Sequence, residues 1–199
     1  ITFSEKQVPS VYSSFSARSL IGSVLQAHMN NQMTENGRPN GIFAGTDHLA
    51  IVIQEELEQM GLRVIEDICR HTDSKDPVAI MKKIILSPYI YMHGPEHHVL
   101  VGSALLAAYK NAGGELDLDA ALEEMRNRGA QVPGGICGLW GTCGAAVSTG
   151  IFVSLITGAS PLSGKEWGLC NEMTSRSLGA IAKTGGPRCC KRDSYTAIL

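Results

Sequence analysis

The chain has 199 residues, of which 44% are hydrophobic and 18% charged, and its formal net charge is -2. This composition is typical of a compact globular protein, and the weak net charge gives no general attraction to nucleic acid or to an anionic membrane. No stretch has the roughly 18 uninterrupted apolar residues of a membrane helix, and no signal-peptide pattern stands at the start. We therefore expect a cytoplasmic protein that binds neither nucleic acid nor membrane.

The two ends of the sequence leave open that the chain is a piece of a longer protein, because Ile1 stands in place of Met and residues 193–199 resemble a helix that has only begun. We expect residues 1–199 to form a single domain. Residues 1–45 are the less certain part, an N-terminal extension or a helix over residues 14–33.

Cap, stop and periodicity signals predict a series of helices along the chain. Gly61 is expected to end the first of them, and the apolar run 62–68 is the one segment that resembles a strand. The helices are predicted at residues 46–60, 77–86, 95–111, 120–128, 139–156 and 163–182, with a last one from Asp193 onward.

The segment 139–156 is rich in small residues, including Gly141, Gly144 and Gly150. Each glycine costs a helix about 1 kcal/mol relative to alanine, so a helix that tolerates several is expected to have another helix or a bound group close against it. The fold class is therefore predicted to be all-α or mostly α, a compact helical domain with a central Gly/Ala-rich helix.

Four of the six cysteines lie in two glycine-rich segments, VPGGICGLWGTCG at 132–144 and GGPRCCKRDSY at 185–195. Six cysteines are too few for a disulfide scaffold, and clustering favours metal or redox chemistry. The spacing of Cys137 and Cys143 and the adjacent Cys189–Cys190 pair suit zinc poorly. An iron-sulfur cluster, with 4Fe-4S as the favoured type, accepts thiolates from several directions.

Consecutive side chains in an extended chain point in different directions, so only one of Cys189 and Cys190 is expected to face a site shared with Cys137 and Cys143. We predict Cys189 as the third ligand, because it follows the Gly-Gly-Pro-Arg turn directly, and Cys190 as a reactive thiol. The basic residues around the pair would offset the charge of a cluster: Arg188, Lys191 and Arg192.

Cysteines outside the two segments are not expected to bind the cluster. These are Cys69 and Cys170. Cys69 and His71 have a spacing that two metal ligands on a strand could share, but no second nearby pair completes a zinc set.

His93, His97 and His98 cluster around the start of the helix predicted over 95–111. The positive end of a helix dipole disfavours a protonated imidazole and so leaves a ring nitrogen available as a ligand or a base. His97 and His98 are the candidate proton carriers. The alternative, that one histidine packs internally and the others are exposed, stays open.

The motifs MHGPEHHVLVGSALL (92–106), VPGGICGLWGTCGAAVSTGIF (132–152), SPLS (160–163) and GGPRCCKRDSY (185–195) resemble an uncharacterised domain family of anaerobic archaea and bacteria. The resemblance covers roughly the second half of the chain, and some members are joined to a methyltransferase-like domain. It implies a possible methyltransferase-like partner and an anaerobic setting that suits an oxygen-labile cluster. The residues that match the family's motif are His93, His97, His98, Cys137, Cys143, Cys189 and Cys190.

Three functions follow from these features. The first is a cluster-dependent lyase or desulfidase, in which an open iron binds a small thiolated or hydroxylated substrate. The second is an electron-transfer or redox-sensing module that serves a methyltransferase partner. The third is a metal-free thiol redox protein that uses Cys189 or Cys190 with Cys137 or Cys143 as resolving partner. The plain alternative is that all four cysteines are small buried hydrophobes.

Overall fold

The computed structural model of the chain describes residues 47–199. The helix expected over 14–33 and most of the predicted extension therefore lie outside the described residues. By its internal contacts the chain divides into two compact units, residues 1–59 and residues 60–199. Among the described helices, none combines the length and the apolar character that crossing a membrane requires.

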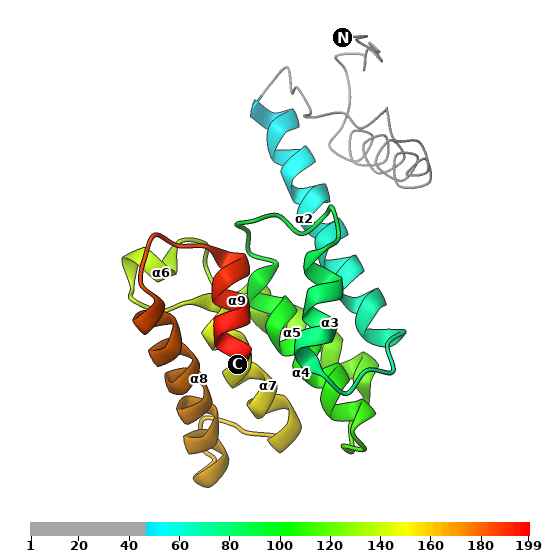
Figure 1. Ribbon diagram of the computed structural model, residues 1–199, viewed down its shortest axis with the longest axis vertical. Helices are drawn as coiled ribbons and strands as arrows, with labels where there is room; N and C mark the ends of the chain where they lie inside the picture. Colours follow the sequence, from blue (N-terminus) through cyan, green and yellow to red (C-terminus); the bar gives the residue numbers. More distant parts are fainter. Residues whose placement is uncertain (1–46) are drawn as a thin grey trace. The chain divides into compact units, whose positions relative to one another are not determined.

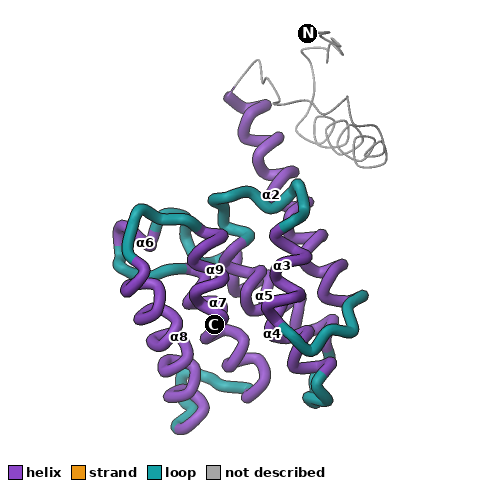
Figure 2. The backbone as a smooth tube through the Cα atoms, in the orientation of Figure 1, coloured by secondary structure: helices purple, strands orange, loops and turns teal. Residues whose placement is uncertain are grey.

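The described part of the chain consists of helices joined by loops, with no strand between residues 47 and 199, so the all-α prediction is confirmed (Figure 2). Its helices are α2 (Asp47–Arg70), α3 (Pro77–Ile85), α4 (His97–Asn111), α5 (Leu118–Ala130), α6 (Ile136–Leu139), α7 (Gly144–Thr157), α8 (Lys165–Thr184) and α9 (Cys190–Ile198).

Helix α2 continues through Gly61 to Arg70, so the predicted helix end at Gly61 and the predicted strand over 62–68 are both wrong. Ile65 and Cys69, one turn apart, are both fully buried, which is the helical spacing of a core-facing stripe. A Cβ on Gly61 would lie 3.0 Å from the carbonyl oxygen of Tyr89. Gly61 thus allows the backbone of α2 to pack closely against Tyr89, and the helix continues past this glycine.

Side-chain caps set two of the predicted helix starts. The carboxylate of Asp76 accepts a hydrogen bond of 2.9 Å from the Val78 amide and opens α3, and Asp117 accepts one of 3.2 Å from the Ala120 amide and opens α5. These bonds satisfy amides that have no partner within the helix. The predicted starts are confirmed within one or two residues.

Helices α4 and α7 form the centre of residues 60–199: α7 packs against α4, α5, α8 and α9, and α4 packs against α3, α5, α7 and α9 (Figure 1). The single helix predicted over 139–156 is divided, because the chain breaks between α6 and α7 with Gly141 at a φ of 66°. Close helix packing explains the small residues. A Cβ on Gly102 of α4 would come within 2.8 Å of the Ser148 carbonyl oxygen of α7, and a Cβ on Gly150 would strike Thr174 of α8.

Three connections meet at one end of the unit formed by residues 60–199. They are α6 with the loop that follows it, the link from α8 to α9, and the loop that enters α4 (Figures 1 and 2). The backbone amide of Lys191 donates to the Met92 carbonyl at 3.3 Å, and its Nζ donates to the Ile85 carbonyl at 3.2 Å. These bonds hold the C-terminal cysteine segment against the loop that precedes α4.

Candidate functional site

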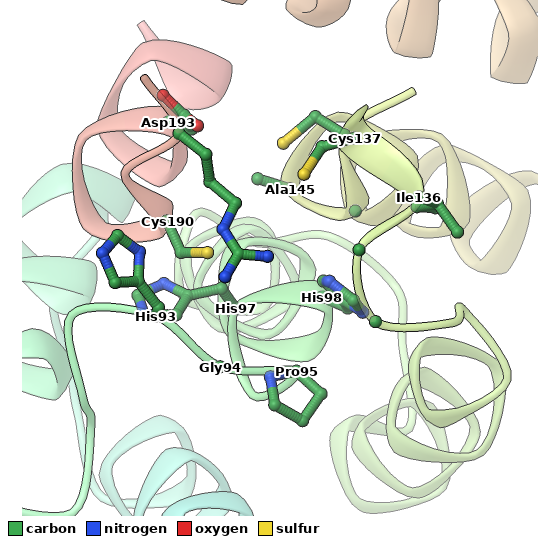
Figure 3. Close-up of a pocket in the computed structure, with 15 residues that line it drawn as sticks. His93, Gly94, Pro95, His97, His98, Ile136, Cys137, Ala145, Cys190 and Asp193 are labelled. Atoms are coloured by element: carbon green, nitrogen blue, oxygen red, sulfur yellow. The ribbon is translucent and has the colours of Figure 1, made fainter. Parts of the chain in front are cut away.

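A cavity of about 200 Å³ lies where helices α4, α7 and α9 begin. Figure 3 shows the side chains of Cys137, Cys190 and His98 directed into it from three different elements. The lining residues come from all three conspicuous segments of the sequence: His93, Gly94, Pro95, His97, His98, Gly134, Gly135, Ile136, Cys137, Cys143, Gly144, Ala145, Arg188, Cys190 and Asp193.

Three thiols share this cavity. Cys137 belongs to α6, Cys143 is the N-cap of α7, and Cys190 is the first residue of α9. Cys189 is the N-cap of α9 in an extended conformation and does not line the cavity. The structure thus brings together two of the predicted ligands, and the member of the adjacent pair that joins them is Cys190.

The remaining two cysteines lie away from the cavity. Cys69 is fully buried in the hydrophobic core, where burial raises its pKa to about 12. His71, its suggested partner, is exposed and lies 3.2 Å from the Asp67 carboxylate. Cys170 lines a separate cavity beside Trp167. Neither Cys69 nor Cys170 contributes to the shared site.

Backbone amides surround two of the cavity's sulfur atoms. Burial raises the pKa of the Cys143 thiol, while the nearby backbone amides of Ala145 and Ala146 act in the opposite direction. Burial also raises the pKa of the Cys190 thiol, opposed by a hydrogen bond from the Gly94 amide. Cys143 and Cys190 are therefore protonated at neutral pH in the ligand-free protein, but backbone amides that would stabilise their anions lie nearby.

His98 offers a free ring nitrogen to the site. Its Nδ1 donates to the Val132 carbonyl oxygen at 3.1 Å, so in the neutral ring Nε2 carries the lone pair. Burial lowers the pKa of His98, and the positive charge of Arg188 adds to that effect. The ring lies against the first turn of α7 so closely that a Cβ on Gly144 would clash with it. His98 is thus fixed in orientation, neutral and able to accept a proton or a metal.

His97 has a different surrounding, although it is the next residue. Its Nε2 donates to the Tyr91 carbonyl oxygen at 2.9 Å, and its Nδ1 lies 2.9 Å from the Ser194 hydroxyl. Burial lowers its pKa to about 4, and the ring is only 1% exposed. Both nitrogens are occupied, so His97 ties the loop before α4 to α9. The third histidine, His93, is exposed at the rim of the cavity.

The three predicted cationic residues have three different positions. Arg188 lines the cavity, and among the described residues its guanidinium has no hydrogen-bond or ion-pair partner. Lys191 is used in the backbone contacts described above. Arg192 donates to the carbonyls of Gly185 and Pro187 at 2.9 and 3.1 Å and pairs with Asp193 at 2.9 Å. Only Arg188 is free to bind something in the cavity.

Among the lining residues that were not predicted as site residues from the sequence, Asp193 and Gly94 act on the thiols. Asp193 is 4% exposed, lies beside the thiols and raises the pKa of both Cys143 and Cys190. Gly94 supplies the amide that faces Cys190. The spacing of Cys190 and Asp193 by three residues on one helix face is the signal that could have identified the aspartate.

Within residues 47–199, no three side chains of His, Cys, Asp or Glu form a ready group of ligands around a single metal ion. Four thiolates on zinc each lie about 2.3 Å from the metal and hence roughly 4 Å from one another. The three thiols of the cavity are not arranged in that way.

Comparison with known proteins identifies the family but no relative of known activity. No curated protein and no solved structure matches the chain. A family model described as a family of unknown function, DUF5714, matches residues 65–199. The match begins well before the first motif noted in the sequence and includes α3, α4 and all the residues that line the cavity. The chain therefore belongs to this family of unknown function.

Proposed function

We propose that this protein binds an iron-sulfur cluster through Cys137, Cys143 and Cys190. The observation that carries the proposal is that three thiols from three different helices line one cavity of about 200 Å³. This cavity is smaller than the roughly 300–1,000 Å³ of sites for drug-sized ligands, and a compact inorganic group suits it better. Cys190 takes the place that we predicted for Cys189.

A cluster fits the cavity better than a single metal ion does. Ligands of one ion must converge to contact distance, and the described residues contain no such group of three. Each thiolate of a four-iron cluster binds a different iron, so its ligands stand further apart around the cavity. A cluster therefore does not require its three thiolates to converge on one point.

The backbone amides near the sulfur atoms also support this proposal. The amides of Ala145 and Ala146 face Cys143, and the amide of Gly94 faces Cys190. Amide hydrogen bonds to sulfur stabilise iron-sulfur sites and adjust their potential. Because coordination to a metal removes the thiol proton, the raised pKa values of Cys143 and Cys190 do not oppose it.

His98 is the residue that we assign to chemistry at the open side of such a site. A cluster held by three cysteines keeps one iron for a substrate and supplies Lewis-acid chemistry there. The bare Nε2 of His98 can take a proton from a bound substrate or return one. His97 has no free nitrogen for that purpose, so we assign it to positioning.

A metal-free thiol protein agrees less well with the same residues. Reactive cysteines have lowered pKa values and sit in exposed electropositive surroundings. In this cavity burial is the largest influence and raises the pKa of Cys143 and Cys190, with Asp193 acting in the same direction, although nearby amides, and Arg188 at Cys190, act against it. We therefore do not adopt the metal-free function.

Purification without oxygen tests the proposal. We expect iron and acid-labile sulfide in comparable amounts, with a broad visible absorption that fades in air. Zinc as the only metal, or no metal after reconstitution with iron and sulfide, would overturn it. Metal analysis and the absorption spectrum are measured on the same sample.

A redox module is a second candidate, because Leu139 and Trp140 are 80% and 69% exposed two and three residues after Cys137. Exposed apolar side chains beside the proposed cluster ligand Cys137 suit the docking of a redox partner. A methyltransferase-like protein is one such partner. A change in the cluster's spectrum on adding small thiols or hydroxy acids favours the enzyme. A reversible redox titration that these compounds do not alter favours the module.

A further inference from the structure

We infer that a second, larger cavity next to the thiols is a binding site for a small aliphatic carboxylate, held by Arg188. This cavity measures about 790 Å³, within the range of small-molecule sites. It shares five lining residues with the thiol cavity, so a ligand in it would lie against the thiols. The shared residues are Gly135, Cys137, Cys143, Arg188 and Asp193.

The wall of this cavity on the α8 side is apolar and small. Leu178, Ile181 and Ala182 face it, together with Gly179. Opposite them are glycines of the loop around α6, and a Cβ on Gly138 or Gly141 would meet nothing within 4 Å. An aliphatic body of a few carbons finds apolar side chains and bare backbone there, and each buried methylene strengthens binding about three- to four-fold.

The charge in the cavity selects the head group. Arg192 and Asp193 neutralise each other at 2.9 Å, whereas Arg188 has no ion-pair partner among the described residues. A guanidinium binds a planar carboxylate through two parallel hydrogen bonds, a geometry that an ammonium ion or an alcohol cannot satisfy. The unpaired Arg188 at the junction of the two cavities therefore places the carboxylate next to the cysteines and the aliphatic chain along α8.

This inference does not rest on the presence of a cluster, and the test separates the two. Isothermal titration of the anaerobically purified protein with hexanoate is expected to show one site, with butanoate roughly ten-fold weaker and hexylamine without binding. Iron content is measured on each sample. If the purified protein contains no iron but still binds hexanoate, the carboxylate site is supported and only the cluster proposal fails.

Two pairs of variants make the test specific. Arg188→Gln is expected to weaken hexanoate binding at least about ten-fold, whereas Arg176→Gln, a control on α8 whose arginine pairs with Glu172, leaves it unchanged. Gly179→Leu would fill the cavity and remove binding, and Gly168→Leu adds the same side chain to α8 away from the cavity.

Three results would overturn the inference. They are equal affinities for hexanoate and hexylamine, unchanged binding in Arg188→Gln, and no binding of hexanoate at millimolar concentrations. Circular dichroism of each variant confirms that a loss of binding is not a loss of the helical fold. The Gly168→Leu control shows directly whether the added leucine on α8 is itself tolerated.

Discussion

The neutral, buried His97 predicts how the stability of the protein depends on pH. Its pKa is about 4 in the folded protein against the ordinary 6.5, because burial opposes the charge. Between these values the unfolded chain binds a proton that the folded protein does not, so the free energy of unfolding falls as the pH drops from 6.5 to 4. The loss attributable to His97 is on the order of 3 kcal/mol, and above pH 6.5 it is absent.

Urea unfolding at several pH values checks this expectation. His97→Gln should lower stability at pH 7 yet show a shallower decline toward pH 4 than the unaltered protein. His71→Gln, which changes an exposed histidine, should keep the full decline. Equal slopes for the unaltered protein and His97→Gln would contradict the assignment of a buried neutral ring.

At the residue scale, the residue types of the site could be predicted from the sequence, but not which member of each adjacent pair faces the cavity. That choice depends on where α9 begins. Cys189 is extended, with φ -143° and ψ 104°, and Cys190 is the first helical residue. Cysteine is not a typical N-cap residue, so nothing in the sequence placed the start there. His97 and His98 differ because their partners lie far along the chain: Ser194 of α9 contacts His97, and the carbonyl of Val132 contacts His98.

At the element scale, the packing of α4 against α7 holds the histidine beside the cysteines. A methyl group on Gly102 would approach the Ser148 carbonyl oxygen to 2.8 Å, a backbone atom that cannot move alone. Gly102→Ala is therefore expected to lower the free energy of unfolding by about 1–3 kcal/mol. Gly168→Ala in α8, where the added Cβ meets nothing within 4 Å, is expected to raise it by about 0.5–1 kcal/mol.

Urea unfolding of the two glycine variants checks the packing argument. A Gly102→Ala protein as stable as the unaltered one would contradict the close approach of α4 and α7. The iron content of Gly102→Ala should fall together with its stability, since His98 and Cys143 lie on the two helices that the methyl group would separate.

The elements with strong local signals could be predicted, and those set by tertiary contacts could not. The helices capped by Asp76 and Asp117 begin within one or two residues of the predicted starts. Gly61 did not end α2, because packing against the Tyr89 carbonyl outweighs its weak helix propensity. The break between α6 and α7 could not be predicted from the sequence. Gly141, which forms the break, resembles Gly150, which serves helix packing within α7.

At the scale of the whole molecule, the site belongs entirely to residues 93–193, within the family match over 65–199. A chain of residues 47–199 is therefore expected to keep its helical circular dichroism and its iron. A chain of residues 76–199 loses the core side chains Ile65 and Cys69 of α2, and we expect it to unfold. Iron bound at full occupancy by residues 76–199 would contradict the placement of α2 in this core.

The central claim is that Cys137, Cys143 and Cys190 hold a cluster, and the adjacent cysteines allow the most direct test. Cys190→Ala and Cys189→Ala differ by one position in the chain, yet only Cys190 lines the cavity. The iron-to-protein ratio after anaerobic purification is expected to collapse in Cys190→Ala and to stay at the level of the unaltered protein in Cys189→Ala. Iron lost in Cys189→Ala and kept in Cys190→Ala would contradict the account.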